Sequence, residues 1–152
     1  MLRVSRLTDY GTMILGCLAQ AEGRSLSAKK IAAATHLRLP TAQKLLKQLA
    51  TRGLVRSERG ALGGYRLARA AREINAVEIL EALEGPMALT ECSHAESQCE
   101  LESFCTVGGA WRQINRAIRG ALTEVTLSDL RRSAPGFRAR TLSADLNARM
   151  GR

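Results

Sequence analysis

Three of the four cysteines in the sequence lie within one short segment, TECSHAESQCELESFC, over residues 90–105. Cys92, Cys99 and Cys105 are separated by six and five residues, whereas structural zinc sites usually hold cysteine pairs two to four residues apart. Three thiolates on one open loop instead suit an iron–sulfur cluster, which needs soft sulfur ligands held several ångströms apart. The spacing therefore predicts an iron–sulfur site.

A fourth ligand is needed, and two residues are candidates. His94 lies inside the loop, and Asp9 is an isolated acidic residue in a basic N-terminal segment. Each also has an ordinary explanation, because His94 could be a solvated surface side chain and Asp9 could compensate the helix N-terminal charge next to Ser5. A disulfide would leave one loop cysteine over, and Cys17, in an apolar helical pattern, is expected in the core.

These residues do not predict an enzyme. A thiol oxidoreductase is an alternative, but the sequence has no Cys-x-x-Cys motif, and residues 73–111 contain no Lys or Arg that would lower the pKa of a loop thiol. The only histidines are His36 and His94, so no Ser/His/carboxylate triad can be assigned.

Charge is distributed unevenly along the chain. Residues 1–72 carry 14 Lys/Arg and 3 Asp/Glu, residues 73–111 carry 8 Asp/Glu and no Lys/Arg, and residues 112–152 carry 9 Lys/Arg and 3 Asp/Glu. The excess of positive charge in the first segment indicates a polyanionic partner. Aromatic residues make up only 3% of the chain, too few for stacking on single strands, so duplex DNA is the expected partner.

The length and composition limit the possible architecture and location of the protein. A chain of 152 residues, 45% of them hydrophobic, fits one domain with an appendage. No stretch approaches the roughly 20 apolar residues of a membrane span, and the first residues lack the apolar run of a signal peptide. We therefore expect a cytoplasmic protein with no membrane partner, in which thiols stay reduced.

The order of the elements predicts a winged helix-turn-helix over residues 1–85. Apolar spacing indicates one helix from Ser5, a short one after Ser27, and a third that begins at Pro40 and stops at Gly53. A turn rich in glycine and arginine then separates two short strands of a hairpin, the wing. The expected fold class is mainly α with a small β-hairpin and a long C-terminal helix.

The polar face of the third helix is the expected DNA-reading surface. Base edges in the major groove would be contacted by Thr41, Gln43 and Lys44, whereas Lys47 and Arg59 would meet phosphates or the minor groove. The same lysines could lie on the solvated face of any helical domain, but the ordered series of elements favours DNA binding. The predicted DNA-binding residues are Pro40, Thr41, Gln43, Lys44, Lys47, Arg59, Gly63 and Gly64.

Three further segments follow the winged helix. Residues 86–109 form the cysteine-bearing loop, and apolar residues from Trp111 onward repeat at a spacing close to 3.5, which predicts a dimerisation helix over residues 110–130. The repeat spans about two heptads, which is short for a coiled coil. The arginine-rich residues 131–152 are predicted to form a flexible basic tail that adds nonspecific DNA affinity.

Together these motifs resemble the winged-helix iron–sulfur regulators of the IscR and NsrR type. The resemblance covers about residues 1–132 and rests on RLTDYG, the helix-turn-helix, the wing ERGALGGYRL, and the C-x6-C-x5-C loop ahead of a Trp-bearing helix. Within that family, the sequence is most similar to the regulators of the SUF iron–sulfur assembly system. This similarity rests on MLRVSRLTDYG at the start, on ALEGPMALTECSH and on ESFC.

The resemblance implies a transcriptional repressor of SUF assembly genes that senses iron–sulfur status through a 2Fe-2S or 4Fe-4S cluster. It also implies a homodimer in which the long C-terminal helix crosses its partner and each winged helix binds half of a palindromic operator. A nitric-oxide- or redox-sensing repressor with such a cluster is the alternative.

The resemblance also bears on the cluster ligands, for which it implies Cys92, Cys99 and Cys105. IscR-like members take a histidine two residues after the third cysteine, and that place is Val107 here. NsrR-like members use an aspartate from the other subunit, in the motif that corresponds to residues 7–11. Asp9 is therefore the expected fourth ligand, with His94 second.

Overall fold

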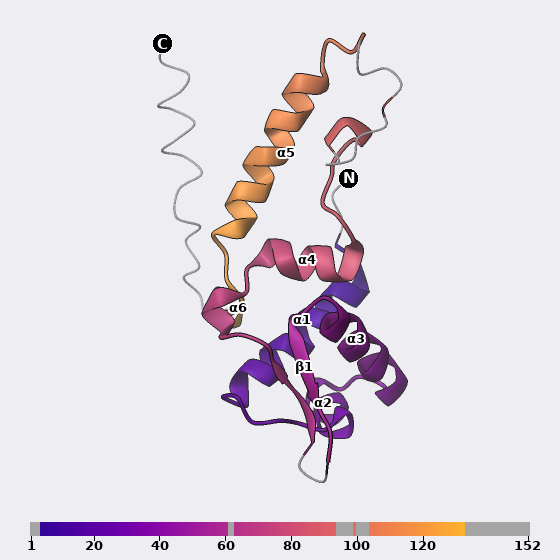
Figure 1. The fold of residues 1–152 in the computed structure, drawn as a ribbon, viewed down its shortest axis with the longest axis vertical. Helices are drawn as coiled ribbons and strands as arrows, with labels where there is room; N and C mark the ends of the chain where they lie inside the picture. Colours follow the sequence, from indigo (N-terminus) through magenta and orange to yellow (C-terminus); the bar gives the residue numbers. More distant parts are fainter. Residues whose placement is uncertain (1–3, 61–62, 94–98, 100–103, 133–152) are drawn as a thin grey trace.

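A computed structural model describes residues 4–60, 63–93, 99 and 104–132 of the chain (Figure 1). The elements in chain order are α1 (Arg6–Gln20), α2 (Ala28–Thr35), α3 (Leu39–Thr51), β1 (Val55–Glu58), β2 (Gly64–Leu67), η1 (Ala71–Glu73), α4 (Ala76–Glu84), η2 (Glu91–Ser93), α5 (Gly108–Thr123) and α6 (Leu127–Arg131). None of the helices in this part of the chain has both the length and the apolar character of a membrane span.

Local sequence signals determine where the first three helices begin and end. Ser5 and Ser27 each accept, through the side-chain hydroxyl, a hydrogen bond from the amide three residues later, as predicted for helix caps. Helix α3 begins at Leu39, one residue earlier than predicted, so Pro40 takes the second helical position, where its missing N–H costs no helical hydrogen bond. Gly53, at φ 73°, follows the end of α3.

The helices of the N-terminal part enclose one apolar core. The predicted buried face of α3 is confirmed, and the same core takes residues from α1, α2, α4 and α6. Each large side chain of this kind contributes about 1.5–3 kcal/mol on burial. The fully buried large side chains are Ile14, Leu15, Leu18, Ile31, Leu45, Leu46, Leu49, Leu54, Ile74, Ile79 and Leu127.

The expectation for Cys17 is wrong, because this residue, expected in the core, is only half-buried. Leu7, at the start of the same helix, is 42% exposed. Cys17 lies one helical turn after Met13, which is 46% exposed, so the two share a face of α1 that turns away from the buried Ile14 and Leu18.

The wing is confirmed as an antiparallel hairpin of β1 and β2, in which Glu58 pairs with Gly64. The returning strand also pairs with the α1–α2 connection, where Leu26 and Tyr65 exchange two backbone hydrogen bonds of 2.9 and 2.8 Å. The wing is therefore attached to the helical body along part of its length.

The C-terminal region differs from the single helix predicted over residues 110–130. Helix α5 ends at Thr123, and Thr126 caps the separate helix α6 through reciprocal hydrogen bonds with Asp129. Backbone hydrogen bonds and a β-bridge join residues 125–127 to residues 74–76, and Leu127 enters the core at 1% exposure. The chain thus returns to the winged helix after α5 projects beyond α4 (Figure 1). Residues 133–152 of the predicted tail lie outside the described residues.

Candidate nucleic-acid interface and cysteine-bearing loop

Helix α3 presents the polar face that the sequence predicts for DNA reading. Four apolar side chains hold its other face in the core: Ala42, Leu45, Leu46 and Leu49. Gln43, Lys44 and Lys47 are exposed on the outer side, and Thr41 is partly exposed. His36, in a left-handed conformation at φ 55°, ends α2 and begins the tight turn before α3. This is the geometry of a helix-turn-helix.

Glu58 fastens the wing to the helical body. Its carboxylate accepts a hydrogen bond from the Ser25 hydroxyl in the α1–α2 connection and another from Arg66 Nε, 2.5 Å away on the opposite strand. The hydrogen bond from Ser25, and then that from Arg66, lower the pKa of Glu58. Arg66 is thus engaged in an internal ion pair, whereas Arg59 at the hairpin tip is exposed.

Gly63 and Gly64, which are among the predicted DNA-binding residues, are required by the hairpin itself. An added Cβ on Gly63 would lie 2.4 Å from the Glu58 carbonyl oxygen, and one on Gly64 would lie 2.5 Å from the Leu26 carbonyl oxygen. Both obstacles are backbone atoms, which cannot rotate out of the way. Close backbone packing within the chain therefore explains why both positions are glycine, and contact of either glycine with DNA stays a prediction.

The beginning of the cysteine-bearing loop is held by α5. Asn115 of α5 is 8% exposed, and its side-chain oxygen accepts a hydrogen bond from the Leu89 amide at 3.2 Å. Cys92 lies in η2, is buried, and has its Sγ 3.1 Å from the Thr90 hydroxyl. Because η2 packs against α5, Cys92 is a fixed part of the described structure.

The other two loop cysteines are partly buried. Cys105 lies just before α5, and an added Cβ on Gly108 would be 3.5 Å from the Cys105 sulfur, so the first residue of α5 leaves room beside the thiol. Cys99 is also partly buried. All four cysteines lie in the described part of the chain and form no disulfide, so the loop carries thiols that can become thiolate ligands.

Among the residues that the structure describes, the predicted ligands do not come together. Within the described residues, no three His, Cys, Asp or Glu side chains are grouped so that they could hold a metal ion. Asp9 is exposed in the first turn of α1, and His94 lies outside the described residues. The three thiols are the kind of donor that an iron–sulfur cluster takes, and contact of Asp9 or His94 with such a cluster stays a prediction.

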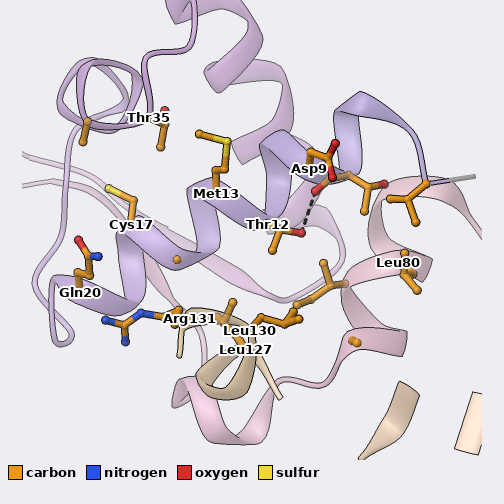
Figure 2. A pocket seen from close by; sticks show the side chains of 16 residues that line it. Asp9, Thr12, Met13, Cys17, Gln20, Thr35, Leu80, Leu127, Leu130 and Arg131 are labelled. Carbon is orange, nitrogen blue, oxygen red and sulfur yellow. Dashed lines mark hydrogen bonds between the residues drawn. The ribbon is translucent and has the colours of Figure 1, made fainter. Parts of the chain in front are cut away.

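Asp9 instead lines a groove of about 680 Å³ between α1 and α6. Figure 2 shows Asp9 toward one end of this groove, with Leu130 and Arg131 of α6 across from α1. Cys17 lines the same groove, which explains its incomplete burial. Burial raises the pKa of the Cys17 thiol, which makes it a less ready nucleophile.

Comparison with known proteins decides the family. Residues 4–133 match the family profile Rrf2, described as an iron-dependent transcriptional regulator. The chain belongs to the Rrf2 family. Rrf2 proteins are transcriptional regulators that bind DNA, so the predicted DNA-binding role and the prediction that the chain is not an enzyme are both confirmed.

Individual Rrf2 relatives agree with this assignment. The HTH-type transcriptional regulator NsrR of Halalkalibacterium halodurans is 30% identical over 131 residues, which cover 85% of this chain and 90% of that protein. The structure of CymR, the global cysteine regulator of Bacillus subtilis, is 34% identical with a TM-score of 0.64, covering 86% of this chain and 97% of that one. The T. potens IscR structure is 34% identical with a TM-score of 0.61, covering 85% of each chain. The winged-helix fold and the resemblance to IscR and NsrR are thereby confirmed.

Sequence reasoning did not single out several residues that organise the Rrf2 domain. Glu58 could have been found, because it is one of only three acidic residues in the strongly basic segment 1–72. Gln48 and Glu84 carry no such signal, since their partners lie far away in the sequence.

Proposed function

We propose that this Rrf2 protein represses the genes of the SUF iron–sulfur assembly system and senses iron–sulfur status through a bound 2Fe-2S or 4Fe-4S cluster. The observation that carries the proposal is the set of three thiols, Cys92, Cys99 and Cys105, on one segment whose beginning packs against α5. The Rrf2 family is described as iron-dependent, which supports a metal centre as the sensor.

The proposed ligands are the three loop cysteines and Asp9 of the partner subunit. In its own chain, Asp9 lines the groove beside α6, and the described residues hold no complete ligand set. A carboxylate contributed across a dimer interface would be the fourth ligand, and His94 is the second candidate. When bound, the cluster supplies an iron centre that responds to iron supply and oxidants.

A homodimer is proposed from the outer face of α5. Val107, Trp111 and Ile114 are 55%, 42% and 43% exposed and recur at helical spacing along one side of this segment. Large apolar side chains in such a row are usually covered by a second helix. Two chains related by a twofold axis would present two α3 helices to a palindromic operator.

Each α3 helix is proposed to enter the major groove of duplex DNA. Its exposed residues Thr41, Gln43 and Lys44 would contact base edges, and Lys47 and Arg59 would contact phosphates or the minor groove. Loss of the cluster would change the relative placement of the two winged helices and so the affinity for the operator.

A nitric-oxide- or redox-sensing repressor is the second candidate. It is favoured by Val107, which occupies the place of the histidine in IscR-like members, and by four cysteines that form no disulfide. Identification of the operator and of its neighbouring genes would separate the candidates, because the first function requires SUF assembly genes beside the operator.

The cluster is tested by anaerobic purification with iron and sulfide analysis and absorbance spectra. We expect iron and sulfide in the wild type and in the matched control Cys17→Ala, and their loss in Cys99→Ala and Asp9→Ala. A colourless wild type that holds only zinc would overturn the proposal. Iron retained in Asp9→Ala and lost in His94→Ala would assign the fourth ligand to the loop.

A further inference from the structure

The last turn of α4, residues 81–84, contacts the recognition helix directly. Gln48 of α3 donates two hydrogen bonds from its side-chain amide, to the carbonyl oxygens of Ala82 at 2.9 Å and Leu83 at 3.1 Å. Carbonyl groups in a last helical turn lack helical partners, so a side-chain donor satisfies them. Gln48 follows Lys47 and lies one turn from Lys44, which are both proposed to contact DNA.

The same turn is attached to two other helices. Glu84 accepts hydrogen bonds from the Ser5 amide at 3.1 Å and from the Thr8 hydroxyl, at the start of α1. Glu81 forms an ion pair with Arg119 of α5, in which the longer nitrogen–oxygen distance is 3.3 Å. Each residue of this turn therefore bonds to a helix other than α4, and the turn cannot move without affecting its neighbours.

The cysteine-bearing loop leaves from this turn. Gly85, at φ 96°, ends α4, and only a short connection separates it from the buried Cys92. That connection is anchored by the hydrogen bond between Leu89 and Asn115 and by the contact between Thr90 and Cys92. A continuous series of bonded contacts thus links the Cys92 thiol to the last turn of α4 and, through Gln48, to the DNA-reading helix.

We propose that Gln48 is a positioning residue that couples the segment around Cys92 to the recognition helix. A change at Cys92 shifts the last turn of α4, and the two hydrogen bonds of Gln48 transmit that shift to α3. The nature of the signal at Cys92 rests on the proposed function, but the coupling does not. Because coupling between two sites is reciprocal, DNA bound at α3 must also change the environment of Cys92.

This reciprocity allows a test in metal-free protein. The alkylation rate of Cys92 by iodoacetamide is measured by mass spectrometry, with and without a saturating duplex that the wild type has selected from a random pool. We expect the duplex to change the wild-type rate about fivefold, within the usual range of allosteric coupling. Gln48→Met removes the donor at similar size and should leave the rate nearly unchanged by DNA.

Two further variants make the test specific. Gln20→Met makes the same chemical change at an exposed position of α1 and should keep the wild-type response. Gln48→Lys retains a donor for the same carbonyl oxygens and should recover most of the response, which a general loss of packing would not allow.

Two results would overturn the coupling: no effect of DNA on the wild-type rate, or equal effects in the wild type and Gln48→Met. The wild-type measurement alone can refute it, whether or not the variants fold. Absence of iron from the anaerobic preparation would instead reject the proposed cluster, so the two failures are distinguishable.

Discussion

Glu58 makes opposing contributions to DNA binding at the scale of one residue. Its negative charge lies in the basic wing, where it should repel phosphate, yet it also holds the wing through Ser25 and Arg66. Because surface charge is screened by salt and the anchoring bonds are local, we expect the anchoring to dominate.

Glu58→Gln should therefore weaken duplex binding about threefold, a size typical of exposed ion pairs. Fluorescence anisotropy with a labelled operator measures this change, and Glu22→Gln is the control, since it removes the same charge from another exposed position. Tighter binding of Glu58→Gln than of the wild type would show that charge repulsion dominates.

At the scale of elements, α3 separates two kinds of DNA contact. Lys47→Ala should weaken binding to all sequences, because a phosphate contact carries no sequence information. It should also reduce the slope of log binding constant against log salt concentration by about one. Gln43→Ala should instead relax the preference for particular bases. Binding to operator and random duplexes across a salt series distinguishes the two, and equal loss of specificity in both variants would contradict the assignment.

The last turn of α4 should respond to acid. Hydrogen bonding from Arg119 lowers the pKa of Glu81, and hydrogen bonds from Ser5 and Thr8 lower the pKa of Glu84, in both cases below the ordinary value of 4.5. Carboxylates with lowered folded-state pKa values stabilise the fold above their ordinary pKa, and this stabilisation is lost as pH falls through the lowered values.

Urea unfolding between pH 7 and pH 3 should thus show a free energy of unfolding that decreases below about pH 4.5. Glu84→Gln should flatten this decrease, whereas Glu124→Gln, at an exposed position after α5, should not. An unchanged pH dependence in Glu84→Gln would mean that its hydrogen bonds to α1 contribute little to stability.

Elements with local signals were predictable from the sequence. The Ser5 and Ser27 caps and the spacing of the α3 leucines act within a few residues, so periodicity locates them. The break between α5 and α6 depends on Thr126 with Asp129 and on pairing with residues 74–76, which a 3.5-residue repeat does not reveal. Hydrogen bonds between distant residues, such as those of Gln48, leave no local pattern at all.

The candidate site was predictable only in part, and the reason lies at the scale of the whole molecule. Composition and spacing identified the loop cysteines and the basic winged helix, but ligands from separate segments, or from a second chain, are placed by tertiary and quaternary structure. Asp9 illustrates this, because in one chain it lines the groove beside α6.

The proposed dimer can be tested through the outer face of α5. Ile114→Glu places a charge within the exposed apolar row and should shift the protein to monomer in sedimentation velocity, with loss of iron if Asp9 acts across the interface. Gln113→Glu adds the same charge at the neighbouring exposed position and should remain dimeric. A dimeric Ile114→Glu variant would place the interface elsewhere.

The whole molecule is proposed to be a DNA-binding regulator whose affinity depends on its metal centre. The most direct test is the operator affinity of one anaerobic wild-type preparation, measured before and after its iron is removed by a chelator. We predict a change of about tenfold or more, within the range of allosteric coupling energies. Equal operator affinity of the iron-loaded and iron-free forms would contradict the proposed regulation by a metal centre.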